Sequence, residues 1–145
     1  MNYQKNLEKL GLKLPDAKAP VGNYVAAKAS GKMLFISGQI SIDEKGELIK
    51  GKLGKDLKTE DGYNAAKRCA LSIVSQVKKA CDGDLSKIKS CVKLTGFVNS
   101  TDDLTPNTSA IFCSVSTSFG GPKAFTVPLS NSIILSEYLA AILMS

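Results

Sequence analysis

The stretch TEDGYNAAKRCALSIVSQVKKAC, residues 59–81, carries the clearest structural signal in this chain of 145 residues. Its apolar side chains recur every three or four residues, whereas lysines and serines fall on the other faces; the apolar positions are Ala66, Ala70, Ile73, Val77 and Cys81. That period is typical of an α-helix with one buried face. The pattern therefore predicts a long amphipathic helix over residues 59–81.

Both ends of this helix carry end signals. Thr59 is a residue type that caps helix N-termini, and Glu60 and Asp61 follow it where the helix dipole favours negative charge. Gly83 lies just beyond the last apolar position, where helices commonly end. We therefore expect Thr59 to be the N-cap.

Two strand-like runs precede the helix. Residues 24–29 and 33–40 are joined by Ser-Gly-Lys at residues 30–32, which suits a hairpin turn. Residues 33–36 are apolar at consecutive positions, which indicates a strand buried on both faces. Further upstream, residues 2–10 predict a short peripheral helix, and the proline-containing residues 14–23 predict an extended connector.

The region after the helix predicts one clear strand and several weaker elements. Residues 88–98 alternate, with Val92, Leu94, Gly96 and Val98 on one face, as a strand that follows a crossover helix would. Residues 109–119 predict a second, weaker helix, since serine and threonine lower helix propensity. Residues 124–129 and 133–144 complete the chain, and the last run fits helix or strand by pattern alone.

Length and composition indicate one compact domain over residues 1–145, with 43% apolar and 22% charged residues. No apolar run is long enough to span a bilayer, and the first residues lack the apolar stretch of a secretory signal. We therefore expect an intracellular, cytoplasmic protein with no membrane partner.

Cysteine spacing and net charge exclude two further classes. The four cysteines, Cys69, Cys81, Cys91 and Cys113, form no Cys-x-x-Cys pair, and the chain has no histidine, so they are interpreted as small buried hydrophobic residues and not as a metal site. The net charge of +6 comes from lysines spread along the chain, without a run of basic and aromatic residues. We expect salt-sensitive attraction to polyanions but no specific nucleic-acid partner.

Six short blocks follow one another between residues 10 and 100. They are Leu-Gly-Leu-Lys-Leu-Pro at 10–15, Ala-Pro-Val-Gly-Asn-Tyr at 19–24, Leu-Phe-Ile-Ser-Gly-Gln-Ile at 34–40, Gly-Lys-Leu-Gly at 51–54, Ala-Ala-Lys-Arg-Cys-Ala-Leu at 65–71 and Val-Lys-Leu-Thr-Gly-Phe-Val-Asn-Ser at 92–100. In order and spacing they resemble the longer-chain branch of the YjgF/Rid family. The blocks fall on the strands and the helix that periodicity predicts.

The resemblance implies an α/β (α+β) fold similar to that of bacterial α/β-type chorismate mutase, in which two helices cover one face of a mixed β-sheet. It also implies a homotrimer with substrate clefts between neighbouring subunits. The activity attached to the family is hydrolysis of short-lived enamine or imine acids released by pyridoxal-phosphate enzymes. Such a site holds a carboxylate, stabilises the iminium form and positions a water molecule, without a metal or an organic cofactor.

Residue by residue, the resemblance places Tyr24 in the cleft lining and Gly38 and Gln39 at the strand end beside it. Asn107, on the second helix, is a further candidate for substrate binding. The residues alone leave other roles open. Tyr24 is also typical of a half-buried strand tyrosine, the Ser-Gly-Gln run of a strand ending in a bulge, and Gln39 of a cap or turn residue.

The family arginine that follows a glycine-rich turn has no counterpart here. Lys123 follows the turn at residues 120–122, and Arg68, the only arginine, belongs to the predicted helix. Lys123 is therefore the candidate that holds the substrate carboxylate, although lysine lacks the planar two-pronged donor of arginine. An exposed turn lysine is the other interpretation.

Glu137 is the candidate that positions the catalytic water, by its resemblance to a glutamate on the last family strand. It lies nine residues beyond Pro128, and an odd spacing turns a strand side chain to the other face unless a bulge intervenes. A surface or interface carboxylate is the alternative role.

Three functions remain open at this point. The first is an enamine or imine deaminase, which is a hydrolase acting on a small carboxylate ligand. The second is a non-catalytic small-molecule-binding or regulatory module with the same fold. The third is an endoribonuclease, an activity attached to relatives, which would here have to cleave RNA without histidine.

Overall fold

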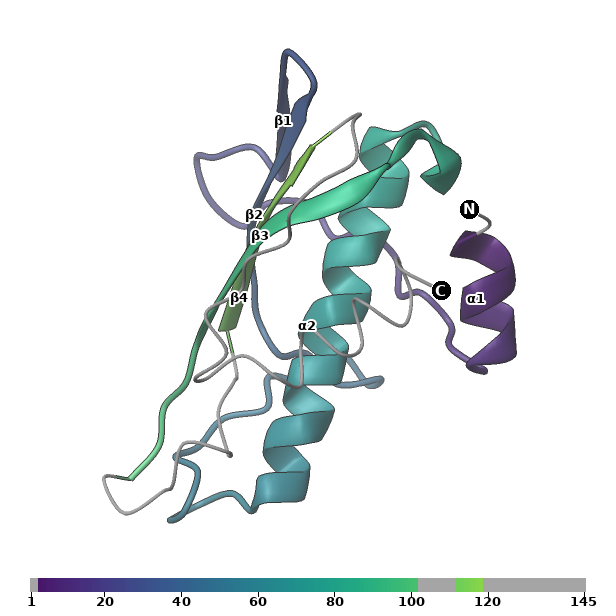
Figure 1. Ribbon diagram of the computed structural model, residues 1–145. Helices are drawn as coiled ribbons and strands as arrows, with labels where there is room; N and C mark the ends of the chain where they lie inside the picture. The colour runs from purple at the N-terminus through teal and green to yellow at the C-terminus, as the bar shows by residue number, and fades with distance from the viewer. Residues whose placement is uncertain (1–2, 102–111, 119–145) are drawn as a thin grey trace.

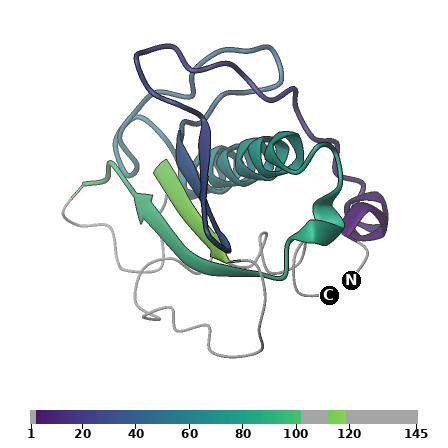
Figure 2. The same ribbon diagram turned by 90° about the horizontal axis from the view of Figure 1, so that it is seen from above.

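A computed structural model gives the fold and describes residues 3–101 and 112–118 (Figure 1). Its four-stranded sheet has the order β1-β2-β4-β3, formed by β1 (Ala27–Ser30), β2 (Met33–Gln39), β4 (Phe112–Ser118) and β3 (Ser90–Phe97). The helices are α1 (Tyr3–Lys9), α2 (Thr59–Ala80) and the 3-10 helix η1 (Leu85–Lys87). Figure 2 shows α2 lying along one face of the sheet, which confirms the expected α+β class.

Helix α2 confirms the long amphipathic helix and supplies the centre of the core. Its inward face carries small side chains, since Ala65, Ala66, Cys69 and Ala70 are each at most 1% exposed. Small side chains at a contact allow two elements to pack at short distance. Ile73, buried one turn further on, extends the same face.

The N-terminus of α2 differs from the prediction. Lys58 is the N-cap and Thr59 is already helical. The Asp61 carboxylate accepts a hydrogen bond from the main-chain N–H of Lys58 at 2.9 Å, as the third helical residue does in a capping box. The prediction that Thr59 is the N-cap is therefore wrong, because the Asp61 carboxylate binds the main chain at Lys58, one residue before Thr59.

The predicted hairpin is confirmed, although its first strand begins at Ala27. Ser30 pairs with Met33, which leaves a two-residue turn in which Gly31 has φ +55°. A positive φ at the first turn position matches the right-handed twist of hairpin strands and favours glycine.

Strand β2 is buried on one face only. Leu34 and Ile36 are at most 5% exposed beneath α2, whereas Phe35 between them is 45% exposed. The expectation that residues 33–36 are buried on both faces is wrong for the described chain, because α2 covers a single face of the sheet. Strand residues alternate sides, so the apolar run divides between the two faces.

The second helix, expected over residues 109–119, is wrong. Residues 112–118 form strand β4, which pairs antiparallel with both β2 and β3. Threonine and valine favour an extended backbone because their branched side chains are restricted in a helix. The two neighbouring strands also supply hydrogen-bond partners to the main chain of residues 112–118. Long-range pairing thus overrides the weak helical spacing.

Strand β3 follows α2 as a crossover, as predicted. Because β2 and β3 both run antiparallel to β4, they are parallel to each other, with β4 between them. Leu94 and Val98 pack against the core as expected, but Val92 is 43% exposed, since a register shift between Cys91 and Lys93 takes it out of the alternation.

The cysteines that the structure describes with their side chains behave as apolar residues. Cys69 and Cys81 are buried, and Cys91 packs against the core. Burial raises the pKa of the Cys69 thiol to about 12 and that of Cys91 to about 11. Both thiols therefore stay protonated at neutral pH, and a protonated thiol is a poor nucleophile.

Helix α1 is docked on the side of the molecule by a buried hydrogen bond. The Tyr3 hydroxyl donates to the Ile88 carbonyl at 2.9 Å, and Leu7 packs in the same cluster. None of the helices described is long and apolar enough to cross a membrane. The runs at residues 124–129 and 133–144 lie outside the described residues.

Gly51 offers a test of the packing below α2. Its φ is +151°, and a Cβ built there would lie 2.7 Å from the Leu57 Cγ. Gly51→Ala should lower the free energy of unfolding by about 2–4 kcal/mol, through backbone strain and a side-chain clash. Gly46→Ala is the control, since Gly46 also has positive φ but no neighbour within 4 Å. Equal losses in urea denaturation would contradict the clash.

Candidate functional site

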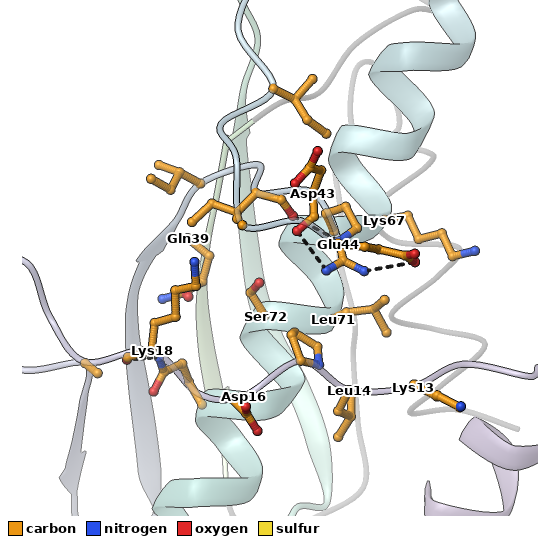
Figure 3. A pocket seen from close by; sticks show the side chains of 18 of the residues that line it. Lys13, Leu14, Asp16, Lys18, Gln39, Asp43, Glu44, Lys67, Leu71 and Ser72 are labelled. Carbon is orange, nitrogen blue, oxygen red and sulfur yellow. Dashed lines mark hydrogen bonds and ion pairs between the residues drawn. The ribbon is translucent and has the colours of Figure 1, made fainter.

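The described residues form an open cavity of about 810 Å³ beside α2. Four segments surround it: the chain from residue 11 to 26, the end of β2, the loop at residues 40–49, and one side of α2 (Figure 3). Its lining mixes apolar, amide and hydroxyl groups with charges of both signs. A volume of this size suits a small organic ligand.

The cavity brings together three residues named from the sequence. Tyr24, Gly38 and Gln39 all line it. Tyr24 lines the cavity and is 50% exposed. Asn107, Lys123 and Glu137 lie outside the described residues.

A β-bulge shapes the edge of the cavity at the end of β2. Ile36 pairs with Val115 and Gln39 with Cys113, so two residues of β2 stand opposite one residue of β4. The Ser37 hydroxyl donates to the Val25 carbonyl, which ties the bulge to the segment carrying Tyr24. The Ser-Gly-Gln run therefore forms a bulge, and its Gly38 and Gln39 also line the cavity.

Gln39 is oriented by the main chain of the same bulge. Its Nε2 donates to the Ser37 carbonyl at 2.9 Å and to the Gly38 carbonyl at 3.3 Å. With the nitrogen used in this way, the amide oxygen points away from the bulge and can accept a hydrogen bond from a ligand or water.

The N-terminal wall of the cavity is hydrogen-bonded to α2. Ser75 donates to the Pro15 carbonyl at 2.7 Å, and Gln76 donates to the Lys18 carbonyl at 2.8 Å. Ser75 and Gln76 are themselves buried, so these bonds are shielded from water. They fix the main chain of an otherwise irregular segment.

Arg68 shapes the opposite wall, a role that the sequence did not indicate. Its Nε donates to the Ile42 carbonyl at 2.9 Å and its Nη2 to the Asp43 carbonyl at 3.3 Å, while Nη1 lies 3.5 Å from the Glu44 carboxylate. Helical spacing could have grouped these residues, because Arg68 lies three or four residues from Asn64, Leu71 and Ser72 and so shares one face of α2 with them. All four residues line the cavity.

The loop at residues 40–49 has its own internal order. The Asp43 Oδ1 accepts hydrogen bonds from the main-chain N–H groups of Lys45 and Glu47, at 2.9 and 2.8 Å. The Ile49 N–H donates to the Ser41 carbonyl at 2.9 Å, which closes the loop at its base. Arg68 therefore holds a preformed turn, not a loose strand of chain.

The charges around the cavity are suited to a small anion with a polar end. Lys13, Lys18, Lys67 and Arg68 line it, with Asp16, Asp43 and Glu44 among them. No group of three histidine, cysteine or acidic residues that could hold a metal ion occurs in the described part of the chain. Carboxylate binding, amide hydrogen bonding and a tyrosine hydroxyl are the chemical functions that this lining offers.

Comparison with known proteins identifies the family of the chain. A family model described as "YjgF/chorismate mutase-like, putative endoribonuclease" matches residues 4–114. The chain belongs to this family. Trypanosoma cruzi "Protein TCP17" is 46% identical over 100 residues, which is 69% of this chain. The chain spans 62% of the length of that relative.

Solved structures of other proteins share the fold. The Agrobacterium tumefaciens protein Atu1372, described as having unknown function, is 27% identical with a TM-score of 0.69, over 81% of this chain and 92% of its own. A Shewanella oneidensis MR-1 protein, described as "a putative endoribonuclease", is 24% identical with a TM-score of 0.71, over 81% of this chain and 99% of its own. At that identity the second likeness supports the fold alone.

Arg68 gives a test of how the cavity wall is held. Arg68→Ala should release the loop at residues 40–49, because two hydrogen bonds from a charged donor are lost, each contributing about 1.5–3 kcal/mol. We expect faster amide exchange at Glu47 and Ile49 and faster tryptic cleavage after Lys45. Lys79→Ala, which removes an exposed charge from the same helix, is the control. Unchanged exchange in Arg68→Ala would contradict the role.

Proposed function

We propose that this YjgF-family protein hydrolyses reactive enamine or imine acids to 2-oxo acids and ammonium. One observation carries the proposal: Tyr24, Gly38 and Gln39, which the family resemblance places in the substrate cleft, line one cavity although Tyr24 lies 14 residues before Gly38 in the chain. Family membership over residues 4–114 supports it.

The chemistry needs little beyond positioning. An enamine first takes a proton at carbon to become the iminium. Water then adds to the iminium carbon and gives one proton to the nitrogen. As the C–N bond of the carbinolamine breaks, the remaining hydroxyl proton leaves with the nitrogen as ammonium, and the carbonyl of the 2-oxo acid remains. The Tyr24 hydroxyl, which both donates and accepts, serves proton transfer at the nitrogen. The Gln39 amide oxygen accepts a hydrogen bond from the attacking water and holds it near the carbon. No redox step occurs.

A binding function without turnover is the second candidate, and Arg68 favours it. The guanidinium of Arg68 is used on loop carbonyls and on Glu44, so this arginine does not take the place of the missing family arginine. In this case the cavity would hold a small carboxylate ligand and signal its presence.

Ribonuclease activity, named in the family description, has less support in this chain. RNA cleavage by acid and base catalysis is most effective with groups that titrate near neutral pH, and the chain has no histidine. RNA cleavage that co-purifies with the protein through successive columns would reverse this conclusion.

The decisive assay follows formation of 2-oxo acid and ammonia from 2-aminoacrylate, generated in situ by a pyridoxal-phosphate lyase. Tyr24→Phe should fold normally and lose about 10²-fold in rate, since a positioned proton-transfer group contributes about that much. Tyr63→Phe is the matched control, because Tyr63 is exposed on α2 and does not line the cavity. No acceleration by the wild-type protein favours the binding function, and equal rates in Tyr24→Phe remove Tyr24 from the site.

The proposal includes assembly as a homotrimer. On the sheet face away from α2, Phe35 is 45% and Phe97 60% exposed in the single chain. Large exposed apolar side chains favour a partner surface. Light scattering should therefore give three times the chain mass of 15.4 kDa. A monomeric mass would contradict a cleft that is completed by a neighbouring subunit.

A further inference from the structure

The cations around the cavity differ in what their side chains do. Arg68 is occupied by the loop carbonyls of Ile42 and Asp43. Figure 3 shows Lys13 and Lys67 directed away from Gln39, whereas Lys18 rises toward it. Of the three lysines labelled in this view, Lys18 is therefore the one whose side chain extends toward Gln39, at the β2 bulge.

The main chain of Lys18 is fixed although its side chain is exposed. The buried Gln76 amide donates to the Lys18 carbonyl at 2.8 Å, and Ser75 holds Pro15 three residues before it. Pro20 further restricts the backbone on the other side of Lys18. A cation on a fixed base loses less entropy when it binds a ligand than one on a mobile loop.

We propose that Lys18 holds the substrate carboxylate in this protein. This inference rests on the proposed function and assigns to a lysine of the N-terminal segment the task that the family pattern gives to an arginine. A carboxylate beside Lys18 would place the adjacent carbon near Gln39 and Tyr24, which line the same cavity.

The same arrangement indicates a substrate class. A lysine is a point charge and does not fix the plane of a carboxylate, so small differences in side-chain shape are tolerated. Asp16, Asp43 and Glu44 also line the cavity and would repel a second carboxylate. The acidic residues of the lining therefore favour monocarboxylic imino acids over dicarboxylic ones.

The test measures binding of the stable product analogue 2-oxobutanoate by ligand-observed NMR, with the neutral 2-oxobutanamide beside it. In Lys18→Met the affinity for the acid should fall about five- to tenfold, as expected for a partly screened charge pair, while that for the amide stays unchanged. Lys18→Arg should keep most of the affinity. Lys32→Met is the control, because it removes one positive charge at the exposed hairpin tip and should leave the affinity for the acid unchanged.

Binding and turnover separate the two proposals. Turnover of 2-aminoacrylate with the same KM in wild type and Lys18→Met overturns the role of Lys18 and leaves the deaminase function standing. Binding of 2-oxobutanoate that depends on Lys18, without any turnover, supports Lys18 and overturns the deaminase. Loss of acid binding in Lys123→Met but not in Lys18→Met assigns the carboxylate to Lys123 and overturns this inference.

Discussion

The packing of α2 against the sheet is the contact on which the rest of the structure depends. A face of alanine and cysteine side chains lets this helix lie close to the strands, and the apolar residues of α1, η1 and β2 gather around it. Protein interiors are packed as densely as crystals of small molecules, so a change in the volume of one of these side chains disturbs the packing. Helix α2 therefore serves both as the centre of the core and as the support for the cavity.

The sides of α2 not used for the core hold the irregular segments by hydrogen bonds. Ser75 and Gln76 bind the chain near Pro15 and Lys18, and Arg68 binds the loop at residues 40–49. The neutral bonds of Ser75 and Gln76 contribute about 1 kcal/mol each and the charged bonds of Arg68 about 1.5–3 kcal/mol each, yet leaving a buried donor unpaired would cost more than a neutral bond contributes. The walls of the cavity are thus specified by polar contacts, and the sheet edge at the β2 bulge completes them.

Elements with a local sequence signal were predicted correctly, whereas elements that depend on long-range contacts were not. The helix over α2 and the β1–β2 hairpin were predicted because their signals, period and turn chemistry, lie within a few residues. The sequence of β4 does not predict a strand, because it is rich in serine and has no strong period. Its structure depends on pairing with β2 and β3. The shift at Val92 was missed because a bulge leaves little trace in alternation.

Patterns in the sequence were enough to predict the α+β class, the family and three residues that line the cavity, Tyr24, Gly38 and Gln39. These follow from periodicity and from motifs whose members are near neighbours along the chain. The folded structure was needed to show that Arg68 supports a loop and that Gln76 holds the main chain at Lys18. The bonds responsible join residues far apart in sequence, 26 positions for Arg68 and Ile42 and 58 for Gln76 and Lys18. Such contacts exist only after α2 has packed on the sheet, so no local pattern announces them.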